Sequence, residues 1–189
     1  MQGDEVEKLF QLAVERISDA SLREEVKQQG SEIAALPTDL VQEIDAECQT
    51  EERAAALGTL IKEMKVAERI KLALFGNLAA RTVLLRDTNR QIPLLVLENP
   101  RLTENEVLEL SRNTQVDDGV LRAIGNNTQW MKNYSLKFNL VSNPKTPIDV
   151  AMKWLKFIKD KDLQRLSRSK NLSQVIATQS RKLLEHRGK

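Results

Sequence analysis

The chain is poor in the residues that usually carry catalysis or bind metals. Its 189 residues include one cysteine, Cys48, and one histidine, His186. A single cysteine excludes an intrachain disulfide and a four-thiolate cluster, and a Ser-His-Asp or Cys-His arrangement would have to use His186. The seven glycines form neither a dinucleotide-binding nor a phosphate-binding loop motif. We therefore expect no catalytic residue, no metal site and no cofactor.

Aromatic residues and long apolar runs are also scarce. No stretch approaches the roughly 20 apolar residues of a membrane span, and residues 1–10 lack the apolar core of a signal peptide. Aromatic residues make up 4% of the chain, whereas 41% is hydrophobic and 30% is charged. The abundant Leu, Ala, Lys, Glu and Arg side chains favour helices, because they lose little rotamer freedom there. We expect an all-α protein of the cytoplasm that does not enter the membrane.

Helical spacing of apolar residues recurs along the chain, and no run alternates apolar and polar residues as a strand would. Residues 4–17 place apolar side chains from Val6 to Ile17 on one face. Residues 50–77 predict one long helix or two joined helices, with Asn77 as the stop. Later apolar stretches end at Asn99-Pro100, Arg112-Asn113, Gly125-Asn126 and Asn143-Pro144. Asn tolerates the left-handed conformation that closes helices, and Pro cannot continue a helix interior.

New helices then begin with good capping residues. Thr103 and Glu106 have the spacing of a capping box, and Pro147 suits a first helical position. The Asn-Pro pairs lie 44 residues apart. Short helices with such recurring ends are typical of an α-solenoid, in which stacked helical hairpins share one core. The spacing is unequal, since residues 72–77 match residues 121–126 at an offset of 49. A non-repetitive helical bundle is the alternative.

Residues 141–155 resemble the repeat of leucine-rich repeat variant proteins, whose units carry Asn-Pro, then Thr-Pro, then an apolar helix. The copy at residues 97–111 lacks the second Pro and has Leu102-Thr103 there. The resemblance covers at most residues 72–185. It implies a right-handed helical solenoid, similar in style to HEAT repeats, with a binding role. The matching positions are Val141, Asn143, Pro144, Thr146, Pro147, Val150 and Leu155. The iron–sulfur cluster of some members is excluded by the single cysteine.

Charge divides the chain into two predicted parts. Residues 1–65 carry 15 acidic and 7 basic side chains, a net charge of −8, and residues 66–189 carry 12 acidic and 22 basic, a net charge of +10. We predict an acidic helical N-terminal region at residues 1–65 and a basic helical-repeat domain at residues 66–189. The acidic region either caps the solenoid, pairs with a second copy in a homodimer, or covers the basic surface of its own chain.

Five of the seven aromatic residues lie within residues 130–157, and lysines are interleaved with them. Helical spacing makes these stripes either core between stacked helices or a groove rimmed by cations. The predicted partner-binding residues are Trp130, Lys132, Lys153, Trp154, Lys156, Lys159, Arg165 and Arg168. We expect a non-catalytic interaction or scaffold module that binds an acidic protein. One alternative is nucleic-acid binding through the same cations. An enzymatic alternative, a helical-repeat DNA glycosylase, would need Asp149 as its carboxylate.

Overall fold

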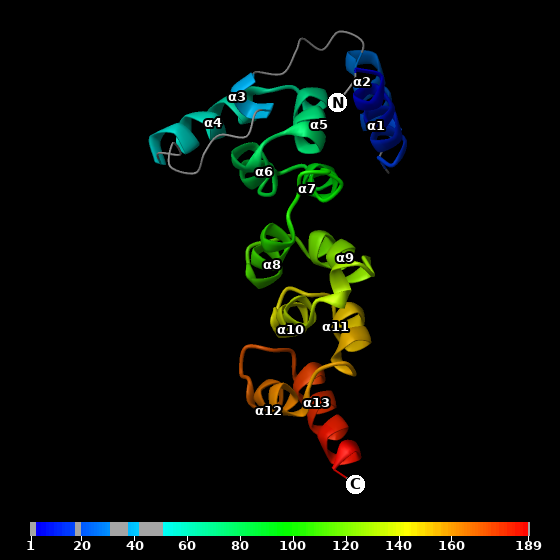
Figure 1. The fold of residues 1–189 in the computed structure, drawn as a ribbon, viewed down its shortest axis with the longest axis vertical. Coiled ribbons are helices and arrows are strands. Elements are labelled where there is room, and N and C mark those ends of the chain that lie inside the picture. The colour runs from blue at the N-terminus through cyan, green and yellow to red at the C-terminus, as the bar shows by residue number, and fades with distance from the viewer. Residues whose placement is uncertain (1–2, 18–19, 31–37, 42–50, 189) are drawn as a thin grey trace. The chain divides into compact units, whose positions relative to one another are not determined.

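The chain is helical throughout the part that the structure describes. The computed structural model describes residues 3–17, 20–30, 38–41 and 51–188, and its regular elements are all helices (Figure 1). This finding confirms the all-α prediction. The helices belong to two compact units, residues 1–102 and residues 103–189. The boundary predicted after residue 65 was drawn from charge and stays a prediction.

The helices of the first unit are α1 (Gly3–Glu15), α2 (Ala20–Gly30), α3 (Thr38–Val41), α4 (Glu51–Glu63), α5 (Val66–Phe75), α6 (Leu78–Leu84) and α7 (Gln91–Val96). The predicted helix at residues 50–77 is two helices, because the chain leaves helical geometry at Met64-Lys65. Helix α5 ends at Phe75, two residues before the predicted stop at Asn77, and Asn77 is also the N-cap of the next helix. Its side chain accepts a hydrogen bond from the N–H of Ala80 at 3.0 Å and so caps α6.

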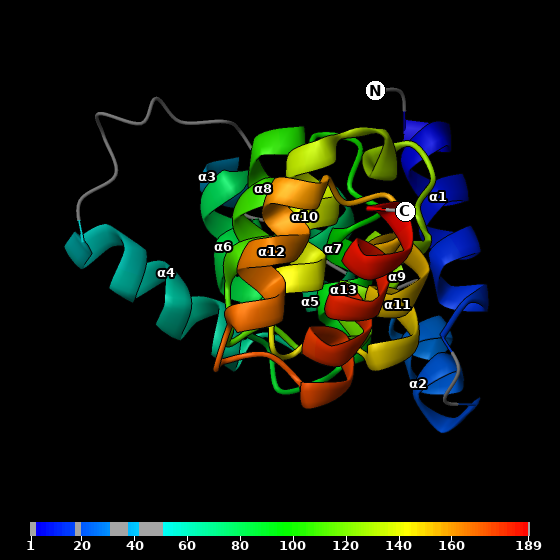
Figure 2. The ribbon, with the colours of Figure 1, turned by 90° about the horizontal axis from the view of Figure 1, so that it is seen from below.

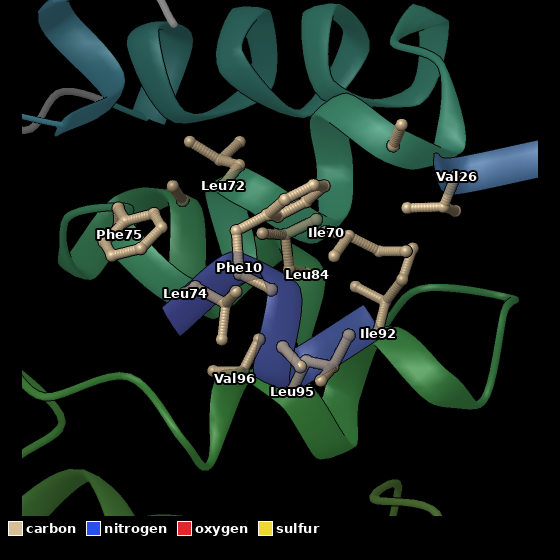
Figure 3. Close-up of a cluster of buried hydrophobic side chains, with 14 of the residues drawn as sticks. Phe10, Val26, Ile70, Leu72, Leu74, Phe75, Leu84, Ile92, Leu95 and Val96 are labelled. Atoms are coloured by element: carbon tan, nitrogen blue, oxygen red, sulfur yellow. The ribbon is translucent and has the colours of Figure 1, made fainter. Parts of the chain in front are cut away.

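The core of the first unit collects apolar side chains from α1, α2, α5, α6 and α7. Figure 3 shows Phe10 of α1 beside Ile70 of α5 and Leu84 of α6. Burying a side chain of this size contributes about 2 kcal/mol, so α1 is held by its apolar face. That face was predicted from residues 4–17, and its buried members are Phe10, Ala13, Val14 and Ile17. Val6 and Leu9 lie outside the residues whose side chains are described.

The helices of the second unit are α8 (Glu104–Arg112), α9 (Asp118–Asn126), the 3-10 helix η2 (Trp130–Lys132), α10 (Tyr134–Ser142), α11 (Ile148–Leu155), α12 (Asp160–Arg168) and α13 (Gln174–Arg187). They form three hairpins, α8–α9, α10–α11 and α12–α13. In each hairpin the second helix begins 14 residues after the first, at residues 118, 148 and 174 against 104, 134 and 160. The connections are five residues long, residues 113–117, 143–147 and 169–173.

Three pairs of equivalent helices from successive hairpins pack on one another. Helix α8 packs against α10, α9 against α11, and α11 against α13. Figures 1 and 2 show α8, α10 and α12 along one side of this unit and α9, α11 and α13 along the other. A shared core joins the last two hairpins, with Val141, Leu155, Leu163 and Ile176 all buried in one cluster. Each helix therefore depends on the neighbouring hairpin to cover its apolar face.

The two Asn-Pro loops have the same local structure. The Oδ1 atoms of Asn99 and Asn143 accept hydrogen bonds from the backbone N–H groups of Arg101 and Lys145, at 2.9 and 3.0 Å. Each asparagine carbonyl also accepts the N–H three positions later, at 3.0 and 3.1 Å. These bonds make an Asx turn within a backbone turn, and the following proline fits because it has no N–H to place.

The same asparagines also hold helix ends that lie far back in the sequence. Nδ2 of Asn99 donates to the carbonyls of Ala73 and Gly76, at 2.9 and 3.2 Å. Nδ2 of Asn143 donates to the carbonyls of Ser111 and Asn113, at 2.9 and 3.0 Å. Both asparagines are buried. Because the last carbonyls of a helix have no partner inside it, these amides satisfy groups that water cannot reach.

Two features of the predicted repeat are corrected by the structure. No described residue has a positive φ, so asparagine does not close these helices in the left-handed conformation. Asn113, for example, leaves α8 in extended geometry with φ −73° and ψ 122°. The 44-residue spacing is also not one repeat. Helices α8 and α10 begin 30 residues apart, and the Asn-Pro loop precedes the first helix of one hairpin but the second helix of the next. Pro147 is the N-cap of α11 rather than its first residue.

The side chain of Thr146 allows a prediction about the stability of the fold. Its hydroxyl is buried and has no hydrogen-bond partner among the described residues, and the corresponding fourth loop positions hold Leu102, Val116 and Leu172. A buried hydroxyl without a partner costs free energy. We expect Thr146→Val to raise the free energy of unfolding by about 0.5–1 kcal/mol, measured by urea denaturation.

The matched control for that change is Ser111→Ala. Ser111 is buried, but its hydroxyl donates to the Leu108 carbonyl at 2.6 Å and accepts from Asn139 at 3.0 Å. Removal of the Ser111 hydroxyl should lower the free energy of unfolding by about 1 kcal/mol. If Thr146→Val and Ser111→Ala lowered the free energy of unfolding equally, the inference that only the Ser111 hydroxyl is hydrogen-bonded would be contradicted.

Candidate functional site

The predicted partner-binding residues all lie in the second unit, but they do not gather at one place. Trp130 and Lys132 are in η2; Lys153 and Trp154 are in α11; Lys156 and Lys159 flank the turn between α11 and α12; Arg165 and Arg168 are in α12. Three of them meet around the end of α11. Lys137 and Phe157, which were not among the predicted site residues, join these three. We call the set Lys137, Lys153, Trp154, Lys156 and Phe157 the aromatic–lysine surface.

Two aromatic rings form the base of this surface. The centroids of Trp154 and Phe157 lie 5.6 Å apart, and the ring planes are tilted by 44°. Nε1 of Trp154 donates to the Gly125 carbonyl at the end of α9, at 2.9 Å, which fixes the half-buried indole. Phe157 is 52% exposed. One ring is therefore anchored in the structure, and the other reaches solvent.

Three lysine side chains lie over these rings. Nζ of Lys153 lies 5.1 Å from the centroid of the Trp154 ring, and Nζ of Lys156 lies 5.3 Å from that of Phe157. Lys137, on the neighbouring helix α10, lies 5.9 Å from the first ring and 5.8 Å from the second. The negative face of an aromatic ring attracts cations at such distances. The rings thus hold the positive charges close together.

A second aromatic–lysine contact lies beside this surface and is tied to α12. Nζ of Lys159 lies 4.7 Å from the centroid of the Tyr134 ring. The Tyr134 hydroxyl donates to Asp162 and accepts from the backbone N–H of Lys159 at 3.2 Å. Burial of the phenol, and then its hydrogen bond to the Asp162 carboxylate, raises the pKa of Tyr134. This network links α10 to α12 and is structural.

The other predicted residues stand apart from the aromatic–lysine surface. Nζ of Lys132 donates to the Gln129 side chain at 2.6 Å, within its own turn. Trp130 is half-buried, and no ring or cation–π contact in the described residues joins it to Trp154. Arg165 faces Asp162 at 3.6 Å, whereas Arg168 lies exposed in the last turn of α12. These residues add positive charge to the unit without contributing to the cluster.

Arginines engage the nearby carboxylates. Arg122 of α9 donates through two nitrogens to Asp149 of α11, and Arg187 donates to Asp160 at 2.7 Å. The hydrogen bond from Arg122 is the largest cause that lowers the pKa of Asp149. Asp149, the carboxylate that a glycosylase would need, therefore serves to join α9 to α11. The lysines of the aromatic–lysine surface are not used in this way.

The described residues contain no group of three or more His, Cys, Asp and Glu side chains placed to hold a metal ion. Cys48 lies outside the described residues. No described helix combines the length and apolar character needed to cross a bilayer.

Tyr134 supports a prediction about stability and pH. Tyr134→Phe removes both hydrogen bonds of the hydroxyl but keeps the ring under Lys159, so at pH 7 the free energy of unfolding should fall by about 1–2 kcal/mol. Folding raises the pKa of Tyr134, so the neutral phenol stabilises the fold below the unfolded pKa of about 10 and loses that effect as pH rises above it.

Urea denaturation of both proteins at pH 7 and at about pH 10.5 measures this difference. The gap between the wild type and Tyr134→Phe should narrow at the higher pH. A gap of the same size at both values would show that the phenol proton plays no part in it.

Comparisons with protein-family models, with curated proteins and with solved structures found no significant match to this chain.

Proposed function

We propose that the chain is a non-catalytic helical-repeat protein that serves as an interaction or scaffold module, and that it binds an acidic protein through the basic surface of residues 103–189. The observation that carries this proposal is the aromatic–lysine surface, where positive charge is concentrated and where no carboxylate of the described residues forms an ion pair with one of its lysines. A cytoplasmic location belongs to the same proposal and is supported by the single cysteine, since disulfides are rare in that compartment.

The packing of the second unit supports a repeat architecture. Successive hairpins have the same internal spacing, and α8 packs against α10, α9 against α11 and α11 against α13. Stacking of this kind gives a short α-solenoid with extended surfaces, which is the form such proteins use for binding. The similarity to leucine-rich repeat variant and HEAT-like repeats stays an interpretation of residues 97–111 and 141–155.

The charges of the second unit support an acidic partner. Residues 103–189 carry 16 basic and 9 acidic side chains, a net charge of +7. Asp149, Asp160 and Asp162 each face an arginine. Among the described residues no carboxylate forms an ion pair with Lys137 or with any other lysine of the aromatic–lysine surface. Unneutralised charge of one sign attracts a partner of the other sign and speeds association.

The acidic N-terminal region is proposed to act as a cap. Helices α1 and α2 pack against α5, and the buried face of α1 covers apolar side chains of the first unit. Terminal repeats of solenoids need such a cover with a polar outer face. Pairing with a second copy and shielding of the basic surface remain the alternatives for this region.

The second candidate function is nucleic-acid binding by the same cations. Lysines interleaved with aromatic rings are typical of surfaces that hold phosphates and stack bases. The sequence pI of about 8.7 lies below the value of about 9 that is usual for nucleic-acid-binding domains.

A binding assay with contrasting probes separates the two functions. The probes are labelled poly-L-glutamate, double-stranded DNA and single-stranded RNA of unrelated sequences, at physiological salt. We expect poly-L-glutamate to bind more tightly than either nucleic acid. Reversing the charges of the three lysines of the surface in Lys137→Glu/Lys153→Glu/Lys156→Glu should weaken that binding by about tenfold or more, because three contacts become repulsive. Fluorescence anisotropy measures both quantities.

The control variant changes the net charge of the unit equally at exposed lysines elsewhere, namely Lys145→Glu/Lys170→Glu/Lys182→Glu. It should weaken binding by less than about threefold. Binding of DNA and RNA tighter than about 1 μM would instead favour the nucleic-acid function, because non-specific affinities at this salt are usually weaker. Equal effects of the two triple variants would contradict a localised surface.

A further inference from the structure

Phe157 exposes an aromatic ring close to two buried apolar residues of the chain. It follows α11 in a turn whose neighbours Leu155 and Ile158 are buried. The other large hydrophobic residues exposed in the second unit, Ile148 and Val175, are aliphatic and lie in the first turns of α11 and α13. Covering the Phe157 ring in a complex would release water from apolar surface that the free protein leaves exposed.

The three lysines above the rings keep donors that a carboxylate can use. An ammonium group has three N–H donors, and a ring face uses its charge without satisfying them. None of the described residues forms a carboxylate ion pair with Lys137, Lys153 or Lys156. The surface therefore combines an apolar ring with several unpaired positive charges in direct contact with it.

We propose that the aromatic–lysine surface binds a short acidic segment of a partner protein, which places one apolar side chain against Phe157 and Trp154 and pairs its flanking carboxylates with the three lysines. This inference rests on the proposed function and assigns the contact to the C-terminal end of α11. A buried apolar anchor supplies most of the affinity in such contacts, and the surrounding charges fix its register.

The geometry of the rings favours a peptide over a stacked nucleobase. The planes of Trp154 and Phe157 are tilted by 44°, so the two rings do not form a continuous flat platform. Ammonium groups already lie over both rings. A base stacks face to face and would compete with these groups for the ring face, whereas an apolar side chain can pack against the edge of the exposed Phe157 ring. A carboxylate would not compete in this way, because it forms ion pairs with the ammonium groups and leaves them over the rings.

Helix α11 offers matched controls at its opposite end. Its eight residues span about 12 Å, which separates the two ends beyond the reach of one side chain. Ile148, 48% exposed at the first turn, matches Phe157 as an exposed apolar residue. Lys145, exposed in the loop before α11, matches Lys153 as an exposed lysine. The same substitutions at both ends therefore change composition and charge equally.

The test uses full-length protein and two fluorescein-labelled peptides. One peptide has a Phe and a Leu flanked by Asp and Glu residues, and the other has Ser in place of the Phe and the Leu. We expect the first to bind at least about tenfold more tightly than the second. Phe157→Ala and Lys153→Glu should each weaken binding of the first peptide by about tenfold. Ile148→Ala and Lys145→Glu should leave its affinity within about twofold.

Other outcomes overturn the inference. Equal affinity for the two peptides would exclude an apolar anchor, and equal effects of Phe157→Ala and Ile148→Ala would place binding elsewhere. Single-stranded RNA that binds more tightly than the first peptide, and loses affinity in Phe157→Ala, would assign the surface to nucleic acid. If poly-L-glutamate binds the wild type while Phe157→Ala leaves the affinity for the first peptide unchanged, the proposed function stands and this inference fails. If poly-L-glutamate does not bind, both fail. Circular dichroism of each variant confirms that the helices are retained.

Discussion

Hydrogen bonds from one helix end to the carbonyls of an earlier helix are the interaction on which this structure depends. The last carbonyls of a helix lack partners within it, and short helices have a large share of such groups. Here the partners are side chains from later in the chain. The side chains of Asn99, Asn143 and Trp154 donate to carbonyls at the ends of α5, α8 and α9. Arg187 donates to the carbonyl of Lys156, the C-cap of α11. Helices of 8 to 10 residues, too short to be stable alone, thereby gain both a packed face and a satisfied end.

The candidate site arises from the same arrangement. The bond from Trp154 to Gly125 holds the indole at the junction of α9 and α11, so the side chain that completes the fold also forms half of the aromatic pair. Arginines form the ion pairs with carboxylates that join neighbouring helices, whereas the three lysines lie over the aromatic rings. The cations that join helices are therefore different from those of the proposed binding surface. Substitution of Phe157, which is exposed, can change binding while the bonds between helices stay in place.

Local signals in the sequence predicted the helices, while the partners of the asparagines required the structure. The Thr103 capping box is confirmed by bonds to and from Glu106, because donor and acceptor lie three residues apart. The Nδ2 bonds of Asn143 reach carbonyls 30 and 32 residues earlier, a distance that a cap pattern does not encode. Lys137 and Phe157 were missed as site residues for related reasons. One lies on a different helix, and the other lies past a helix end, where helical projection no longer gives the direction of a side chain.

The most direct test is the effect of Asn143→Ala on the end of α8, which the asparagine contacts from about 30 residues later in the chain. The measurement is the free energy of unfolding together with amide hydrogen exchange at the end of α8, with the exposed Asn105→Ala of α8 as the control. The account predicts a loss of about 2 kcal/mol and faster exchange at residues 110–113, because two carbonyls lose their donor. A loss within about 0.5 kcal/mol of the control, with unchanged exchange at the end of α8, would contradict it.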